Sequence, residues 1–148
     1  MANVHDVAAY ILGKAGTMST MKLQKLVYYC QGWSLAWDGE PIFPETIRAW
    51  ANGPVVYELF DLHRGKFRVS SWPEGDAKRL TPDQVDTADA VLDAYGHLSG
   101  QQLIEKTHRE RPWIEARGGI SDGAYCNTEI ELETMQDFFG GLATANEV

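Results

Sequence analysis

The residue types that could do chemistry are present in this chain, but their spacing forms no catalytic or metal-binding motif. The four histidines show no close ligand spacing, and Cys30 and Cys126 form no Cys-x-x-Cys pair. Cys30 has no base near it in the sequence, and we expect both cysteines to be buried and unreactive. No glycine-rich phosphate-binding loop occurs. We therefore expect a protein that is not an enzyme and needs neither a cofactor nor a metal.

The polar residues that stand out lie near the start of a predicted helix over residues 19–37. Ser19 is suited to cap that helix, and Asp38-Gly39 is suited to end it. Apolar or small residues recur there at spacings of three and four, which predicts one stripe facing a core: Leu23, Leu26, Val27, Cys30, Ser34 and Trp37.

Lys22 and Lys25 occupy the first turns of this helix, where the helix dipole favours acidic residues. In one interpretation, solvent screens the two charges and they have no role. In the other, they form with Gln24 a polar patch on a rigid helix that contacts a partner. The residues alone leave both interpretations open.

The other patterns predict a mainly helical α+β fold with a small antiparallel sheet. Residues 4–12 repeat at helical spacing and Gly16 would end that helix, whereas residues 47–50 alternate as a strand does. Gly53-Pro54 should turn the chain into a helix over residues 55–63, because proline suits a first helical position. Residues 67–72 alternate again and could pair with the strand at 47–50.

Thr81-Pro82-Asp83-Gln84 is typical of a helix start, and the helix should run to about Tyr95. One face of it carries four acids: Asp83, Asp86, Asp89 and Asp93. This face either serves solubility or docks a basic partner. A further helix is expected from Ser99 to about Arg109, after which residues 111–113 redirect the chain.

Composition indicates one domain: the chain has 148 residues, of which 44% are hydrophobic, and a net charge of −8. Residues 1–70 hold seven cations and six acids, whereas residues 71–148 hold six and fifteen. With no concentrated basic surface, specific binding of nucleic acid is not expected. With no leader and no long apolar run, we expect a cytoplasmic protein without a membrane segment. The sequence makes no prediction about self-association.

Three blocks and a final helix resemble, in order, the motifs of the Panacea domain, a family of bacterial and phage antitoxins that includes SocA-type proteolytic adaptors. The matching segments are Lys22–Gly32, Ile47–Val56, Thr107–Trp113 and Ile130–Phe139. This resemblance implies a single domain over residues 1–139 and a short tail over residues 140–148. Ala51-Asn52 departs from the pattern, since a larger basic or aromatic pair is common before Gly53.

The resemblance implies an antitoxin that neutralises a cognate protein toxin, encoded next to it, by direct binding. The alternative is an adaptor that delivers the toxin to a protease. Matching positions that are polar or aromatic are expected to bind the partner: Lys22, Gln24, Lys25, Tyr29, Trp33, Trp50, Asn52, His108 and Arg109. Four others are expected to be architectural: Gly53, Pro54, Pro112 and Trp113. Lys25→Glu should then leave the fold intact and weaken toxin binding.

Overall fold

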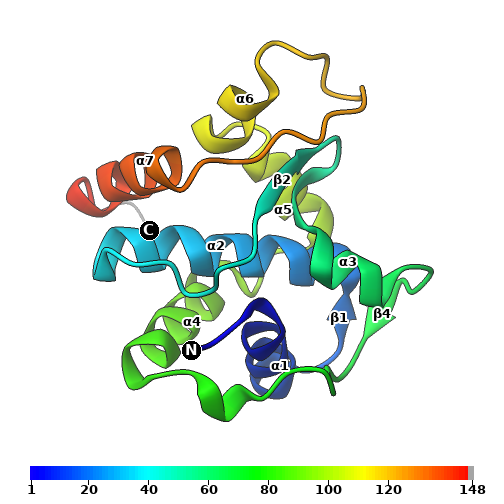
Figure 1. Cartoon of the computed structure of the whole chain (residues 1–148), viewed down its shortest axis with the longest axis vertical. Coiled ribbons are helices and arrows are strands. Elements are labelled where there is room, and N and C mark those ends of the chain that lie inside the picture. The colour runs from blue at the N-terminus through cyan, green and yellow to red at the C-terminus, as the bar shows by residue number, and fades with distance from the viewer. Residues whose placement is uncertain (147–148) are drawn as a thin grey trace.

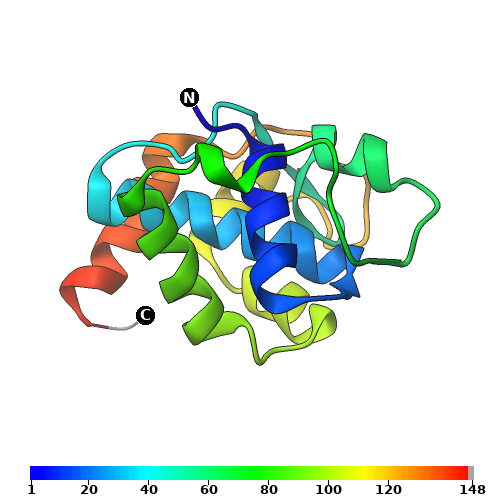
Figure 2. The same cartoon turned by 90° about the horizontal axis from the view of Figure 1, so that it is seen from below.

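A long central helix, α2 (Thr20–Asp38), organises the fold, and the other helices pack around it. The computed structural model describes residues 1–146. Helices α1 and α4 lie on one side of α2 and α7 on the other (Figure 1). Figure 2 shows the same arrangement from below, with α1 and α4 in front of α2. The prediction of a mainly helical α+β fold is confirmed.

The described residues form seven α-helices, one short 3-10 helix and two two-stranded antiparallel sheets. Besides α2, the helices are α1 (Val4–Ala15), α3 (Tyr57–His63), η1 (Ala77–Arg79), α4 (Pro82–Tyr95), α5 (Gly100–Thr107), α6 (Arg111–Arg117) and α7 (Leu132–Thr144). The strands are β1 (Met18–Ser19), β2 (Ile47–Trp50), β3 (Gly53–Val56) and β4 (Arg68–Val69).

The predicted helix ends are confirmed where a side chain caps the backbone. Ser19 accepts a hydrogen bond from the backbone N–H of Lys22, and Gly39 ends α2 in the left-handed conformation. Thr81 and Ser99 both form capping boxes, at the starts of α4 and α5. These local signals place the helix starts correctly because each depends on residues only three apart.

The prediction of a single apolar stripe on α2 is wrong, because this helix is buried on nearly every side. Residues 23–35 are all buried, whereas Trp37, which was assigned to the stripe, is 40% exposed. The most extensive contact is with α7, where the ring of Phe139 lies against Gly32 and Trp33. A helix in this position must satisfy its polar side chains inside the protein.

The residues from Gly53 to His63 correct a second prediction. Pro54 does not begin a helix: it lies in β3, opposite Ala49 of β2, and α3 starts only at Tyr57. The turn falls at residues 51–52, and Gly53 follows with a φ of +105°. The two valines after Pro54 favour the extended conformation, which here prevails over the suitability of proline for a helix start.

The predicted pairing of residues 67–72 with the strand at 47–50 is also wrong. Strand β4 pairs instead with β1, with Met18 opposite Val69. Strand β2 has β3 on one edge, and on its other edge the backbone of residues 128–130 donates to it and accepts from it. The two-residue strand β1 was missed because so short a segment carries no periodicity.

The last helix extends beyond the predicted domain end. Helix α7 continues to Thr144, so residues 140–144 belong to it and not to a tail. Of the remaining predicted tail, residues 147–148 lie outside the described residues.

Candidate functional site

The polar residues at the start of α2 lie inside the protein, where they bind the backbone of β3. The side-chain amide of Gln24 accepts from the N–H of Val56 at 2.9 Å and donates to the C=O of Val56 at 3.1 Å. The Nζ of Lys25 donates to the C=O of Pro54 at 3.1 Å. Both side chains are at most 1% exposed. They therefore replace the neighbouring strand that the free edge of β3 lacks.

The expectation that four residues of α2 contact a partner is corrected by their burial. Gln24, Lys25, Tyr29 and Trp33 are at most 1% exposed, so none can reach a partner in this structure. The hydroxyl of Tyr29 donates to Glu110 at 3.0 Å, and the indole N–H of Trp33 donates to the hydroxyl of Tyr95 at 2.9 Å. Neither of the two interpretations holds for Lys25, because its side chain is not solvated and is not accessible to a partner.

Of the remaining predicted contact residues, Lys22 and His108 are half-buried and engaged within the fold. Lys22 Nζ donates to the C=O of Gly96 at 2.6 Å, and so joins α2 to the end of α4. His108 stacks on Trp113 with ring centroids 4.0 Å apart. Arg109 is exposed but lies apart from the groove described below.

Trp113 is buried, and its indole N–H donates to the C=O of Trp50 at 2.8 Å. Pro112 is buried in the first turn of α6.

At Gly53, an added Cβ would lie 2.6 Å from Cε of Lys25 and 2.9 Å from Oγ1 of Thr107. The absence of a side chain at Gly53 thus makes room for the buried lysine.

Glu110 is another buried ionisable group, 6% exposed, that accepts from the hydroxyls of Tyr28 at 3.3 Å and Tyr29 at 3.0 Å. Burial raises the pKa of its carboxyl to about 7, although both hydrogen bonds act in the opposite direction. The protein therefore holds a carboxyl that is largely protonated in the folded state below neutral pH.

We expect Glu110→Gln to stabilise the protein at pH 8 by about 3 kcal/mol and to leave its stability nearly unchanged at pH 4.5. The folded-state pKa is raised, so the neutral carboxyl is tolerated at low pH, and stability is lost as the pH rises from about 4.5 to about 7. Urea unfolding of both proteins across this range measures the difference. A constant difference at all pH values would contradict the assignment.

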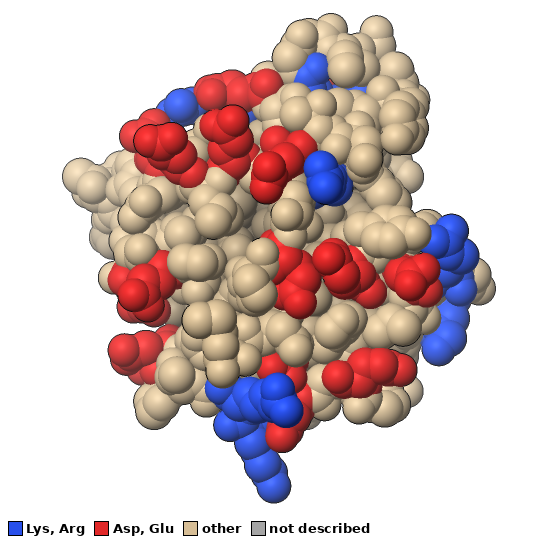
Figure 3. Space-filling model, viewed as in Figure 1, with Lys and Arg blue, Asp and Glu red and all other residues tan. Residues whose placement is uncertain are grey.

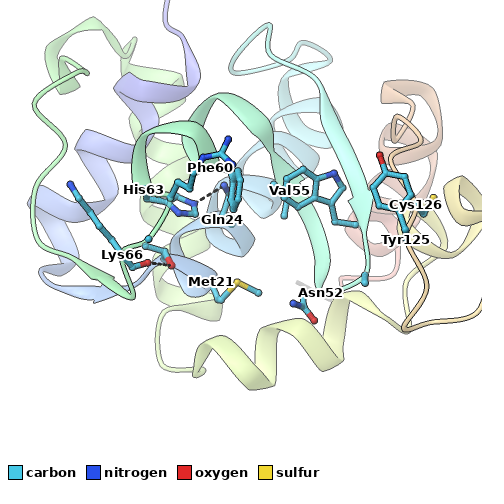
Figure 4. A pocket seen from close by; sticks show the side chains of 14 residues that line it. Met21, Gln24, Asn52, Val55, Phe60, His63, Lys66, Tyr125 and Cys126 are labelled. Atoms are coloured by element: carbon cyan, nitrogen blue, oxygen red, sulfur yellow. Dashed lines mark hydrogen bonds between the residues drawn. The ribbon is translucent and has the colours of Figure 1, made fainter.

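An open groove of about 470 Å³ lies beside the buried polar group of Gln24. Its walls come from the start of α2, the turn between β2 and β3, helix α3 with the loop after it, and residues 125–126 (Figure 4). Three of the predicted contact residues line it: Gln24 is buried in its wall, whereas Trp50 and Asn52 reach its surface. For Trp50 and Asn52, therefore, the predicted contact residues coincide with an open groove on the protein surface.

The polar groups in the wall of the groove are bound to one another. Gln24 Nε2 lies 3.0 Å from Nε2 of His63 (Figure 4). The same amide nitrogen donates to the C=O of Val56. The His63 nitrogen must accept this bond, so the imidazole is neutral, and burial lowers its pKa. A ligand in the groove thus meets few free hydrogen-bonding groups from these two side chains.

Aromatic and aliphatic side chains supply the rest of the surface. The rings of Trp50 and Phe60 meet edge to face, with centroids 5.0 Å apart, and Tyr57 lies next to both. Tyr125 stands at the far end of the groove from His63 and is 84% exposed (Figure 4). Large exposed aromatic side chains beside an apolar hollow are typical of a protein-binding surface.

Cations gather at one rim of the groove. Arg64 and Lys66 line the groove, and Arg68 follows Lys66 by two residues in the chain. Residues 64–68 contain no acid, and all three cations are exposed. In Figure 3 acidic side chains spread over the face shown, and lysines and arginines form one group at the edge where α3 and β4 lie and another at the lower end of the molecule. The rim differs in sign from the net charge of the chain, which is −8.

Sequence reasoning missed most residues of the groove: Met21, Val55, Phe60, Arg64, Lys66 and Tyr125. Two signals were available. Residues 64–68 combine three cations with an aromatic residue, and Tyr125 is a lone aromatic residue in a loop rich in small and polar residues. Neither signal shows that the two segments line the same groove, because they are far apart in the chain.

Comparison with known proteins places the chain in a family. Residues 23–114 match the family described as "Antitoxin SocA-like, Panacea domain". The chain belongs to this family. It is also 27% identical over 150 residues to "Antitoxin SocA" of Caulobacter vibrioides (strain NA1000 / CB15N), covering 90% of this chain and 80% of that protein. No solved structure matches the chain.

Two kinds of feature are absent from residues 1–146. No group of three or more His, Cys, Asp or Glu side chains there is placed to hold a metal ion. None of the helices in that range is both long and apolar enough to cross a membrane.

Proposed function

We propose that this Panacea-family protein is an antitoxin that neutralises a cognate protein toxin by direct binding, with the groove beside α3 as the contact surface. The observation that carries the proposal is an apolar hollow flanked by exposed aromatic residues, in a chain of an antitoxin family. Tyrosine, tryptophan and arginine dominate the energetics of protein interfaces, and Trp50, Arg64 and Tyr125 all line this groove.

A protein suits the groove better than a small molecule because the apolar surface continues outside it. Phe67 lies next to the groove residue Lys66 in the chain and is 76% exposed, while Tyr57 packs on Trp50 and is 46% exposed. An enclosed ligand site would cover its aromatic residues, whereas these reach into solvent. Their exposure favours a partner that covers the groove and its surroundings together.

We expect Tyr125→Ala to weaken the complex with the toxin by about 10- to 30-fold, because this exposed ring should become buried on binding. The toxin is sought by co-expressing the protein with each adjacent reading frame and scoring growth rescue and co-purification. Affinity is then measured with the purified pair. Ile114→Ala is the control, since Ile114 on α6 is 46% exposed but lies outside the groove. Equal affinities of both variants would exclude the groove as the contact surface.

The same pair separates direct neutralisation from delivery to a protease. Direct neutralisation predicts that purified protein inhibits the toxin near 1:1 stoichiometry without any protease, either by covering its active surface or by holding it inactive. Delivery predicts rescue only in cells with the protease, together with loss of the toxin. Inhibition by far less than one equivalent would instead indicate an enzyme and contradict the proposal.

A further inference from the structure

We infer that the groove takes an acidic segment of the partner that carries one or two large apolar anchor side chains. This inference rests on the proposed function in that it describes the part of the toxin that binds. It follows from two properties of the groove, an apolar wall and a cationic rim, and each can be tested separately.

The wall selects for apolar side chains. Met21, Val55 and Phe60 line the hollow, and the amide of Gln24 is used by Val56 and His63. A polar group placed against these side chains would lose its water without gaining a partner, at a cost of about 1–3 kcal/mol. An aromatic or branched aliphatic side chain has no such cost and gains by burial.

The size of the hollow limits how much of the partner it can hold. Its volume is about 470 Å³, near the lower end of the range of about 300–1,000 Å³ for ligand sites in general. One or two large side chains of a helix or an extended segment match this volume, as in other grooves that bind peptide anchors. The flanking residues of the segment must then lie over the rim.

The rim selects for acidic flanks. Arg64 lies 3.3 Å from Asp61 and over the ring of Phe60, so its charge is partly compensated. Lys66 and Arg68 are exposed and form no ion pair within the described part of the chain. Residues 57–68, which form α3 and the segment after it, hold two acids, Glu58 and Asp61, and three cations. The net charge of this segment is therefore positive.

The charge of the rest of the molecule strengthens this selection. With a net charge of −8, most of the surface repels an acidic segment and attracts a basic one. An acidic segment is therefore steered to the rim, whereas a basic segment would be drawn to the acids of α4 and α7. The sign of the rim thus specifies both the place of binding and the partner's charge.

The test uses three synthetic fluorescent peptides of equal length with the whole protein. The first has tryptophan and leucine anchors between aspartates and glutamates, the second the same anchors between lysines and arginines, and the third acidic flanks with alanines as anchors. We expect anisotropy titrations to show the first binding at least about 10-fold more tightly than either of the others. Its affinity should fall as salt rises from about 50 mM to about 200 mM.

The matched variants are Lys66→Glu/Arg68→Glu in the rim and Lys78→Glu/Arg79→Glu on η1. Both pairs are exposed and change the net charge equally. Lys66 lines the groove and Arg68 lies two residues after it, whereas Lys78 and Arg79 lie on η1, outside the groove. Only the rim variant should lose the preference for the acidic peptide. Equal effects of the two variants, equal binding of the first two peptides, or equal binding of the alanine peptide would overturn the inference.

The peptide and toxin experiments can fail independently. If the protein neutralises its toxin but shows no preference for the acidic anchored peptide, the antitoxin role stands. The inference that the groove binds an acidic segment is then wrong. If the protein shows the full peptide preference but neither binds nor neutralises an adjacent gene product, the inferred preference of the groove stands. The proposed antitoxin role is then wrong.

Discussion

The Lys25→Glu variant is expected not to accumulate as a folded protein. Lys25 is completely buried, and its Nζ donates to the C=O of Pro54 at 3.1 Å. A glutamate there would place a carboxylate oxygen against the carbonyl oxygen of Pro54, and both are acceptors. It would also bury a negative charge without a partner. Such a change costs more than about 4 kcal/mol, a large share of the stability of an ordinary domain. Soluble yield, far-UV circular dichroism and the urea midpoint measure the outcome.

Lys25→Met tests whether burial of the charge is the cause. Burial lowers the pKa of Lys25 to about 7, so the free-energy cost of its charge is fully present below that pH and disappears as the pH rises toward 10.5. We expect the methionine variant to fold, and its stability relative to the wild type to be most favourable below pH 7. Lys14→Glu, at an exposed site on α1, is the control for charge reversal. A stable Lys25→Glu protein would contradict the assignment.

The contrast between Lys25 and the helix caps shows what the sequence could predict. Ser19, Thr81 and Ser99 were assigned correctly, since each cap involves residues three apart. Lys25 and Gln24 satisfy a strand edge about 30 residues later in the chain. The sequence showed that a lysine in the first turns of α2 was unusual, but nothing in the sequence showed that an unpaired backbone would lie against it.

The groove could not be predicted for a related reason. Residues 125–126 reach it because the segment that follows them, 128–130, pairs with the outer edge of β2. Trp50 was selected from a family motif, and the structure adds Phe60, Arg64 and Tyr125 beside it. A surface built from four separate segments depends on their packing, whereas periodicity and capping reveal only the segments themselves.

The second large effect is expected at Gly32, in the middle of α2. An added Cβ would lie 2.2 Å from Cε2 of Phe139 and within 2.7 Å of two other ring atoms. The Phe139 ring is fully buried among Tyr28, Tyr29 and Trp33, so it cannot move aside without shifting α7. We expect Gly32→Ala to destabilise the protein by about 2 kcal/mol, which lowers the melting temperature by roughly 4–8 °C.

Gly13→Ala separates crowding from helix propensity. Gly13 lies within α1, is exposed, and an added Cβ there would meet nothing within 4 Å. Alanine is the better helix former by about 1 kcal/mol, so this variant should be somewhat more stable than the wild type. Gly32→Ala gains the same stability from helix propensity, but we expect the overlap with Phe139 to cost more stability than this gain. Trimming that ring in a Gly32→Ala/Phe139→Leu double variant should therefore cost less than the sum of the two single changes, whereas strict additivity would show that the glycine does not serve to admit the ring.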